Sequence, residues 1–203
     1  MNNLPRKQLI LMGLRGSGKS TLGRALAASF DAPFTDLDER TAAHLGAPTA
    51  GEAFRRVGEP AFRIAEAEVL AKVLAKVPEE ARAETPHILA LGGGTPTAPG
   101  AADLIARARR EGHAYVVFLD PPLEVLAARL RAETGDRPSL TGRGVVEEME
   151  EIAARRRPLY AALADLVVGQ DACDAAGELS QAAAIERVAR SILTGFRASE
   201  STS

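Results

Sequence analysis

An eight-residue motif near the N-terminus constrains the fold of this chain more than any other feature. Residues 13–20 read GLRGSGKS, which fits the pattern G-x-x-x-x-G-K-[ST] at every fixed position. The pattern predicts a loop that wraps backbone N–H groups around phosphate oxygens at the positive end of a helix. Lys19 would then reach the β- and γ-phosphates, and the Ser20 hydroxyl would ligate Mg²⁺. The expected nucleotide-binding residues are Gly13, Gly16, Ser17, Gly18, Lys19, Ser20 and Thr21.

The flanks of this loop decide between a phosphate site and a chance glycine-rich turn. Residues 9–12 are an apolar run typical of a buried strand, and residues 21–30 carry apolar side chains at helical spacing. A strand before the loop and a helix after it are what the phosphate site requires. Further strands are expected at 32–36, 88–91, 115–119 and 166–168, and further helices at 39–45, 49–57, 60–77, 101–110, 123–132, 145–163 and 182–193.

Strand–helix alternation predicts an α/β fold with a parallel sheet and helices on both faces. Ligands of such sheets bind outside the carboxyl ends of the strands. The 203 residues suggest one domain, with a core over about 9–193 and a disordered tail over 197–203. The net charge of −2 gives no support for a nucleic-acid or membrane partner, and a single cysteine fits a reducing compartment, so the cytoplasm is expected. The three histidines show no metal-ligand spacing.

Two carboxylates follow the second expected strand. Asp36 and Asp38 flank Leu37, and alternate residues of an extended segment point the same way. One carboxylate could hold Mg²⁺ through water, and the other could orient or deprotonate an acceptor hydroxyl. The alternative is that Asp38 only caps the helix that begins at Glu39.

Three further features suit a phosphate-transfer site, and each has a plain alternative. The triplet Gly92, Gly93 and Gly94 follows a buried strand and would let a ligand approach the backbone, or it is a loose turn. Arg63 lies on a long helix, where it could instead pair with Glu66 on a solvated face. Residues 134–144 lack apolar periodicity and contain Arg137, which suits a lid over the phosphate or a solvent-exposed loop. In the triplet at 155–157, one arginine is expected to point inward.

Taken together, these residues resemble the shikimate kinase family. The match spans about residues 9–168 and consists of an ordered set: GLRGSGKS at 13–20, FTDLD at 34–38, GEPAFRIAE at 58–66, LGGGT at 91–95, RP at 137–138 and RRPLY at 156–160. The resemblance implies a three-layer α/β/α P-loop kinase with a five-stranded parallel sheet, similar to nucleoside-monophosphate kinases. It also implies a mobile lid over about 131–145 and an acceptor-binding region over about 37–70.

The implied reaction is ATP-dependent phosphorylation of the 3-hydroxyl of shikimate, on the route to chorismate, by a monomer that uses Mg²⁺. The resemblance makes Lys19, Asp38 and Arg137 catalytic, with Arg137 also on the nucleotide phosphates. It places Asp38, Arg63, Gly92, Gly93, Gly94 and Arg156 at the substrate, Ser20 and Asp36 at the metal, the latter through water, and Arg129 or Arg131 beside the adenine.

Two other functions fit parts of the pattern. A related P-loop kinase could act on another hydroxy acid such as gluconate, and a non-catalytic relative could sense a ligand. A sensor should have lost Lys19, Ser20 or Asp38, and all three are present. The lid reads RPSL at 137–140 where the family usually has RPLL, which leaves Arg137 in place.

Overall fold

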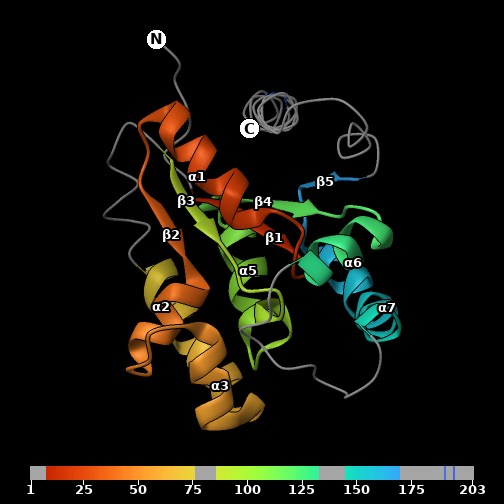
Figure 1. The fold of residues 1–203 in the computed structure, drawn as a ribbon. Helices are drawn as coiled ribbons and strands as arrows, with labels where there is room; N and C mark the ends of the chain where they lie inside the picture. The colour runs from red at the N-terminus through yellow and green to blue at the C-terminus, as the bar shows by residue number, and fades with distance from the viewer. Residues whose placement is uncertain (1–7, 76–85, 133–144, 170–189, 191–193, 195–203) are drawn as a thin grey trace.

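A computed structural model describes residues 8–75, 86–132 and 145–169, together with Arg190 and Thr194. Its five strands are β1 (Gln8–Gly13), β2 (Phe34–Asp36), β3 (His87–Ala90), β4 (Ala114–Leu119) and β5 (Leu166–Val168). They form one parallel sheet in the order β2-β3-β1-β4-β5. The predicted five-stranded parallel sheet is thereby confirmed. The strand that leads into the phosphate loop lies at its centre (Figure 1).

Side chains of the central strands alternate between two separate apolar clusters, because successive residues of a strand point to opposite faces. In β1, Leu9 and Leu11 belong to one cluster, and Ile10 and Met12 to the other. All six residues of β1 and all six of β4 are buried, as expected for strands covered on both faces. The strands were recognisable as apolar runs for this reason.

Helices cover both faces of the sheet and complete three layers (Figure 1). Helix α1 (Lys19–Phe30) packs Leu22 and Leu26 onto the first face. Helices α5 (Ala101–Arg110) and α7 (Val145–Leu163) pack Ile105 and Tyr160 onto the second. The remaining helical elements are α2 (Leu37–His44), α3 (Ala50–Ala75), α6 (Leu123–Ala132) and the 3-10 turn η1 (Thr95–Thr97). Within the described residues, no helix is long and apolar enough to cross a membrane.

Helix α3 contains the break that the sequence predicts between residues 57 and 60. Gly58 has φ 78° and ψ 165°, which is not helical, so the element is two helices joined at a kink. Pro60 lies two residues after Gly58, near the start of the second helix, where the fixed φ of proline is tolerated. The first half is capped as expected, because the Glu52 N–H donates to Thr49 Oγ1 at 3.1 Å. Phe54 and Phe62 then meet edge to face across the kink.

Some predicted boundaries need correction. Helix α1 begins at Lys19, two residues earlier than predicted, since the last residues of the motif form its first turn. Strand β2 begins at Phe34 instead of residue 32, because the Ala32 N–H closes α1 by donating to the Ala27 carbonyl. The lid at 131–145 lies mostly outside the described residues, as do most of the helix predicted at 182–193 and all of the tail at 197–203.

Candidate active site

The phosphate loop, residues 13–20, has the backbone that its glycines predict. Gly16 and Gly18 adopt positive φ angles of 78° and 90°, which side-chain-bearing residues rarely tolerate. A Cβ on Gly13 would lie 2.5 Å from the Leu119 carbonyl oxygen, so this position also has no room for a side chain. The loop ends at the N-terminus of α1, where free N–H groups and the helix dipole favour an anion.

Lys19 is buried and folds back over its own loop. Its Nζ donates to the Leu14 carbonyl oxygen at 2.8 Å and to Ser17 Oγ at 3.2 Å. Only 7 % of Lys19 is exposed, so its charge lies in a site where water screens it little. An ammonium held at this place can exchange these neutral oxygens for phosphate oxygens without leaving the loop.

Ser20 and Asp36 meet beside the loop. Ser20 Oγ donates to Asp36 Oδ2 at 2.6 Å, across the gap between α1 and the end of β2. Asp36 also caps α2, since its Oδ1 accepts from the Asp38 N–H at 3.0 Å. The capping role that the sequence left open for Asp38 therefore belongs to Asp36.

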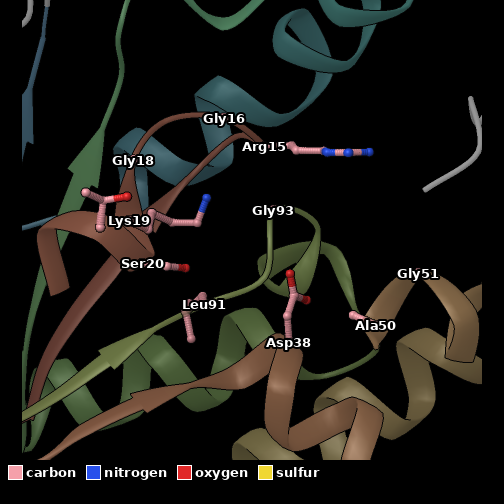
Figure 2. A pocket seen from close by; sticks show the side chains of 11 residues that line it. Arg15, Gly16, Gly18, Lys19, Ser20, Asp38, Ala50, Gly51, Leu91 and Gly93 are labelled. Atoms are coloured by element: carbon pink, nitrogen blue, oxygen red, sulfur yellow. The ribbon is translucent and has the colours of Figure 1, made fainter. Parts of the chain in front are cut away.

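Asp38 lies in the first turn of α2 and not in an extended segment, so the argument from strand alternation does not hold. Its side chain nevertheless reaches the same cavity as the phosphate loop. That cavity has a volume of about 340 Å³ (Figure 2). Its lining residues are Arg15, Gly16, Gly18, Lys19, Ser20, Thr21, Asp38, Ala50, Gly51, Leu91 and Gly93.

The glycine turn, residues 92–94, is packed closely on several sides. A Cβ on Gly92 would lie 2.5 Å from both Asp38 Oδ1 and Glu66 Oε1, so these two carboxylates are close neighbours. A Cβ on Gly94 would overlap the guanidinium of Arg63. The turn is therefore packed closely against side chains of α2 and α3, and the loose-turn alternative does not describe it.

Arg63 is largely buried instead of solvated, with 12 % of its side chain exposed. It pairs with Glu66, as the helical spacing allows, and also with Glu59 at 3.3 Å. Burial opposes its charge, but the two carboxylates outweigh burial and raise the pKa of Arg63. For the fully buried Glu66, burial together with the like charge of Asp38 raises the pKa, against the opposing effect of Arg63. Thr95 Oγ1 donates to Glu66 at 2.9 Å and holds this carboxylate in place.

Arg156 approaches the glycine turn from the other side. Its Nη1 donates to the Gly93 carbonyl oxygen at 3.0 Å, and burial lowers the pKa of Arg156. The Tyr160 hydroxyl donates to the same oxygen at 2.8 Å, and burial raises the pKa of Tyr160 to about 12, so it stays a donor at neutral pH. Arg157 also points inward and donates to Asp120 Oδ1 at 2.8 Å and to the Pro121 carbonyl at 3.3 Å.

The arginines predicted beside the nucleotide are only partly placed. Arg129 Nη1 donates to the Gly16 carbonyl oxygen at 2.9 Å, which puts Arg129 against the phosphate loop, while Arg131 is exposed. Arg137 lies outside the described residues. Arg15, Glu66 and Tyr160 were not assigned to the site from the sequence. All three lie within the motifs that carry the family resemblance, and Glu66 was also named as a helical partner of Arg63, but none was given a role at the site.

Comparisons with known proteins agree with this geometry. A sequence model of the family described as shikimate kinase matches residues 15–194. A shikimate kinase of Nitratidesulfovibrio vulgaris is 40 % identical over 167 residues, which cover 81 % of this chain and 87 % of that protein. A shikimate kinase of Caulobacter vibrioides is 37 % identical over 158 residues, which cover 78 % of this chain and 72 % of that protein.

The solved structures that are similar to this chain include shikimate kinases. A shikimate kinase from Acinetobacter baumannii in complex with shikimate superimposes with a TM-score of 0.72 at 27 % identity, covering 92 % of this chain and 90 % of that one. A gluconokinase from Sinorhizobium meliloti has a TM-score of 0.52 at 19 % identity, covering 97 % of this chain and 94 % of that one, and it shares the fold alone. With the family match spanning most of its length, the chain belongs to the shikimate kinase family.

Proposed function

We propose that this chain transfers the γ-phosphoryl group of ATP to the 3-hydroxyl of shikimate, with Mg²⁺ and the site residues named above. The observation that carries the proposal is one cavity that joins two half-sites. It is lined on one side by the phosphate loop and on the other by Asp38 and the glycine turn, against which Arg63 and Arg156 pack. A nucleotide on the first half-site would point its terminal phosphate at an acceptor on the second.

The donor half supplies positive charge and backbone donors. Phosphoryl transfer depends mainly on positioning and on neutralising charge on the transferred group. Lys19 is held within the loop and would move from Leu14 and Ser17 onto phosphate oxygens. Gly16 and Gly18, with their left-handed backbone, would let the loop N–H groups converge on the same oxygens.

Ser20 and Asp36 fit a magnesium ion. Mg²⁺ takes hard oxygen ligands, keeps several waters and needs few protein groups. The Ser20 hydroxyl and the Asp36 carboxylate are 2.6 Å apart beside the loop. The hydroxyl would be a direct ligand of the ion, and the carboxylate would act through water. No cluster of three or more histidine, cysteine or acidic residues that could hold an ion occurs in the described parts of the chain. Ser20 and Asp36 would hold the ion beside the phosphates, where its positive charge would offset part of their negative charge.

The acceptor half would hold and activate the hydroxyl. Asp38 faces the cavity from α2 and would accept the hydroxyl proton as the oxygen attacks phosphorus. Arg63 and Arg156 approach the glycine turn from α3 and α7, so a carboxylate lying over this turn would receive two guanidinium groups. Hydroxy acids with a carboxylate therefore suit the site better than neutral sugars.

The choice of acceptor is tested directly by enzyme assay. The purified chain with Mg-ATP should release ADP rapidly with shikimate, and far more slowly with quinate or gluconate. A coupled assay with each acceptor varied gives kcat/KM for the three. Gluconate as the preferred acceptor would support the other hydroxy-acid kinase, and binding of shikimate without ADP release would support the sensor. A monomer in the cytoplasm remains a prediction from the sequence.

The acceptor clamp gives a second test. Lysine keeps the charge of arginine but loses the planar fork that matches a carboxylate. Arg63→Lys and Arg156→Lys should each raise KM for shikimate by about ten-fold to a hundred-fold, since a hydrogen bond to a charged group contributes about 1.5–3 kcal/mol. KM for ATP should change much less. Steady-state kinetics with each substrate varied in turn measures both. Arg63→Ala and Arg156→Ala, which remove the charge as well, should cost at least as much, and an unchanged KM for shikimate in both would contradict the clamp.

A further inference from the structure

We infer that Arg15 binds the carboxylate of the acceptor, as a third guanidinium supplied by the phosphate loop itself. This inference rests on the proposed function and adds a substrate-binding residue to it. Arg15 occupies a variable position of the motif GLRGSGKS, so the phosphate-binding pattern assigns it no role. The position of Arg15 in the structure indicates a role at the acceptor half-site.

Arg15 lies where the donor and acceptor half-sites touch. A Cβ on Gly93 would come within 2.9 Å of the Arg15 backbone N and 3.5 Å of its Cβ, so the loop rests directly on the glycine turn at this residue. Arg15 also lines the cavity together with Asp38. Its side chain extends away from Lys19 and Ser20, toward the side of the cavity where Ala50 and Gly51 lie (Figure 2).

Three arginines thus surround the glycine turn from three different elements. Arg63 of α3 packs its guanidinium on Gly94, and Arg156 of α7 donates to the Gly93 carbonyl oxygen at 3.0 Å. Arg15 comes from the loop after β1, its backbone and Cβ contact Gly93, and both residues line the cavity. An anion over the turn would therefore meet cations from α3, α7 and the phosphate loop.

The local charges explain why a third cation is needed. Arg63 already pairs with two carboxylates, and these offset part of the positive charge that it presents to an incoming anion. Asp38 adds a third negative charge at the same cavity, and Arg156 can offset only one of the three negative charges. Counted without Arg15, the three carboxylates of this half-site outnumber its two arginines, and this weakens the attraction that Arg63 and Arg156 exert on an anionic acceptor. Those carboxylates are Asp38, Glu59 and Glu66.

A role of Arg15 at the transferred phosphate is the main competing assignment. That group would lie near Lys19 and the N-terminus of α1, and the Arg15 side chain extends away from both (Figure 2). The two assignments predict different kinetics. Loss of an acceptor contact raises KM for shikimate, whereas loss of a contact made to the phosphoryl group in the transition state lowers kcat.

Steady-state kinetics of three variants test the inference. Arg15→Met keeps most of the apolar stem and removes the charge, and Arg15→Lys keeps the charge. Arg110→Met removes an exposed arginine at the end of α5, away from the cavity lining, and is the matched control. Arg15→Met should raise KM for shikimate about ten-fold with little change in kcat or in KM for ATP. Arg15→Lys should recover part of this loss, and Arg110→Met should behave as wild type.

A substrate lacking the negative charge identifies the group that Arg15 contacts. With the methyl ester of shikimate, the wild type and Arg15→Met should show the same KM, because the ester leaves no carboxylate to lose. A penalty that persists with the ester, a fall in kcat, or a raised KM for ATP would each overturn the inference. Absence of turnover by the wild type with shikimate would refute the proposed function instead, so the two failures are distinguishable.

Discussion

Replacing Lys19 with alanine should reduce phosphoryl transfer to below about one-thousandth of the wild-type rate. Lys19 is the cation of the phosphate loop, and its ammonium lies 2.8 Å from the Leu14 carbonyl oxygen inside a buried site. Charge stabilisation there is worth far more than at the surface, because little water screens it. The measurement is kcat by coupled ADP release at saturating shikimate and ATP.

A control must separate loss of charge from loss of structure. Lys72→Ala removes an exposed lysine from the last turn of α3 and should leave kcat unchanged. Circular dichroism and thermal unfolding should show that Lys19→Ala still folds, since the Leu14 carbonyl keeps a donor in the Ser17 N–H at 3.2 Å. A folded Lys19→Ala protein with near wild-type kcat would mean that the phosphate loop is not the donor site.

Asp38→Asn should lower kcat by about 10²–10⁴, the range for a general acid–base group. The amide keeps the shape of the side chain but cannot accept the proton of the acceptor hydroxyl. KM for ATP should change little, because Asp38 faces the acceptor half of the cavity. Rapid-quench single-turnover kinetics would place the loss in the chemical step.

Asp103→Asn is the matched control for this variant. Both aspartates lie in the first turn of a helix, where a negative charge interacts favourably with the helix dipole. Asp103, however, is exposed on α5. Its variant should keep full activity with at most a small loss of stability. If Asp38→Asn instead behaves like Asp103→Asn, losing stability alone, then Asp38 serves only its helix.

The fold could be predicted from the sequence because its signals are local. Helices α5, α6 and α7 begin and end at the predicted residues, where proline, glycine or a change of periodicity marks their limits. The strands of a buried parallel sheet are continuous apolar runs, which made β4 recognisable. The break inside α3, at Gly58, falls between the two helices predicted at 49–57 and 60–77.

The predicted limits of helices and strands were wrong where one residue belongs to two structural features. Lys19 and Ser20 belong both to the phosphate motif and to the first turn of α1, and the motif alone does not say where the helix begins. Asp36 ends β2 and caps α2 through the Asp38 N–H, which leaves no extended residue between them. Asp38 therefore lies in a helical turn, and the alternation of an extended strand that we assumed for the two aspartates does not apply.

The sequence motifs name single residues, but they do not give the contacts between them. Arg63 and Arg156 lie far apart in the chain and both contact the glycine turn in the structure, while their binding of a substrate stays a prediction. The contact of Arg15 with Gly93 depends on the order β3-β1 in the sheet, which sets the phosphate loop beside the glycine turn. No spacing pattern encodes that contact, because it joins residues 78 positions apart through tertiary packing.

Arg156 and Arg157 are neighbours on α7 with unequal partners. Arg157 is bound to the carboxylate of Asp120, whereas Arg156 donates to the neutral carbonyl of Gly93. An incoming carboxylate that competes for Arg156 would displace only a dipole, while at Arg157 it would have to displace a full charge. The exchange is therefore favourable at one arginine and close to neutral at the next. Helix α7 can release one guanidinium to a ligand while the adjacent ion pair keeps the helix fastened to the end of β4.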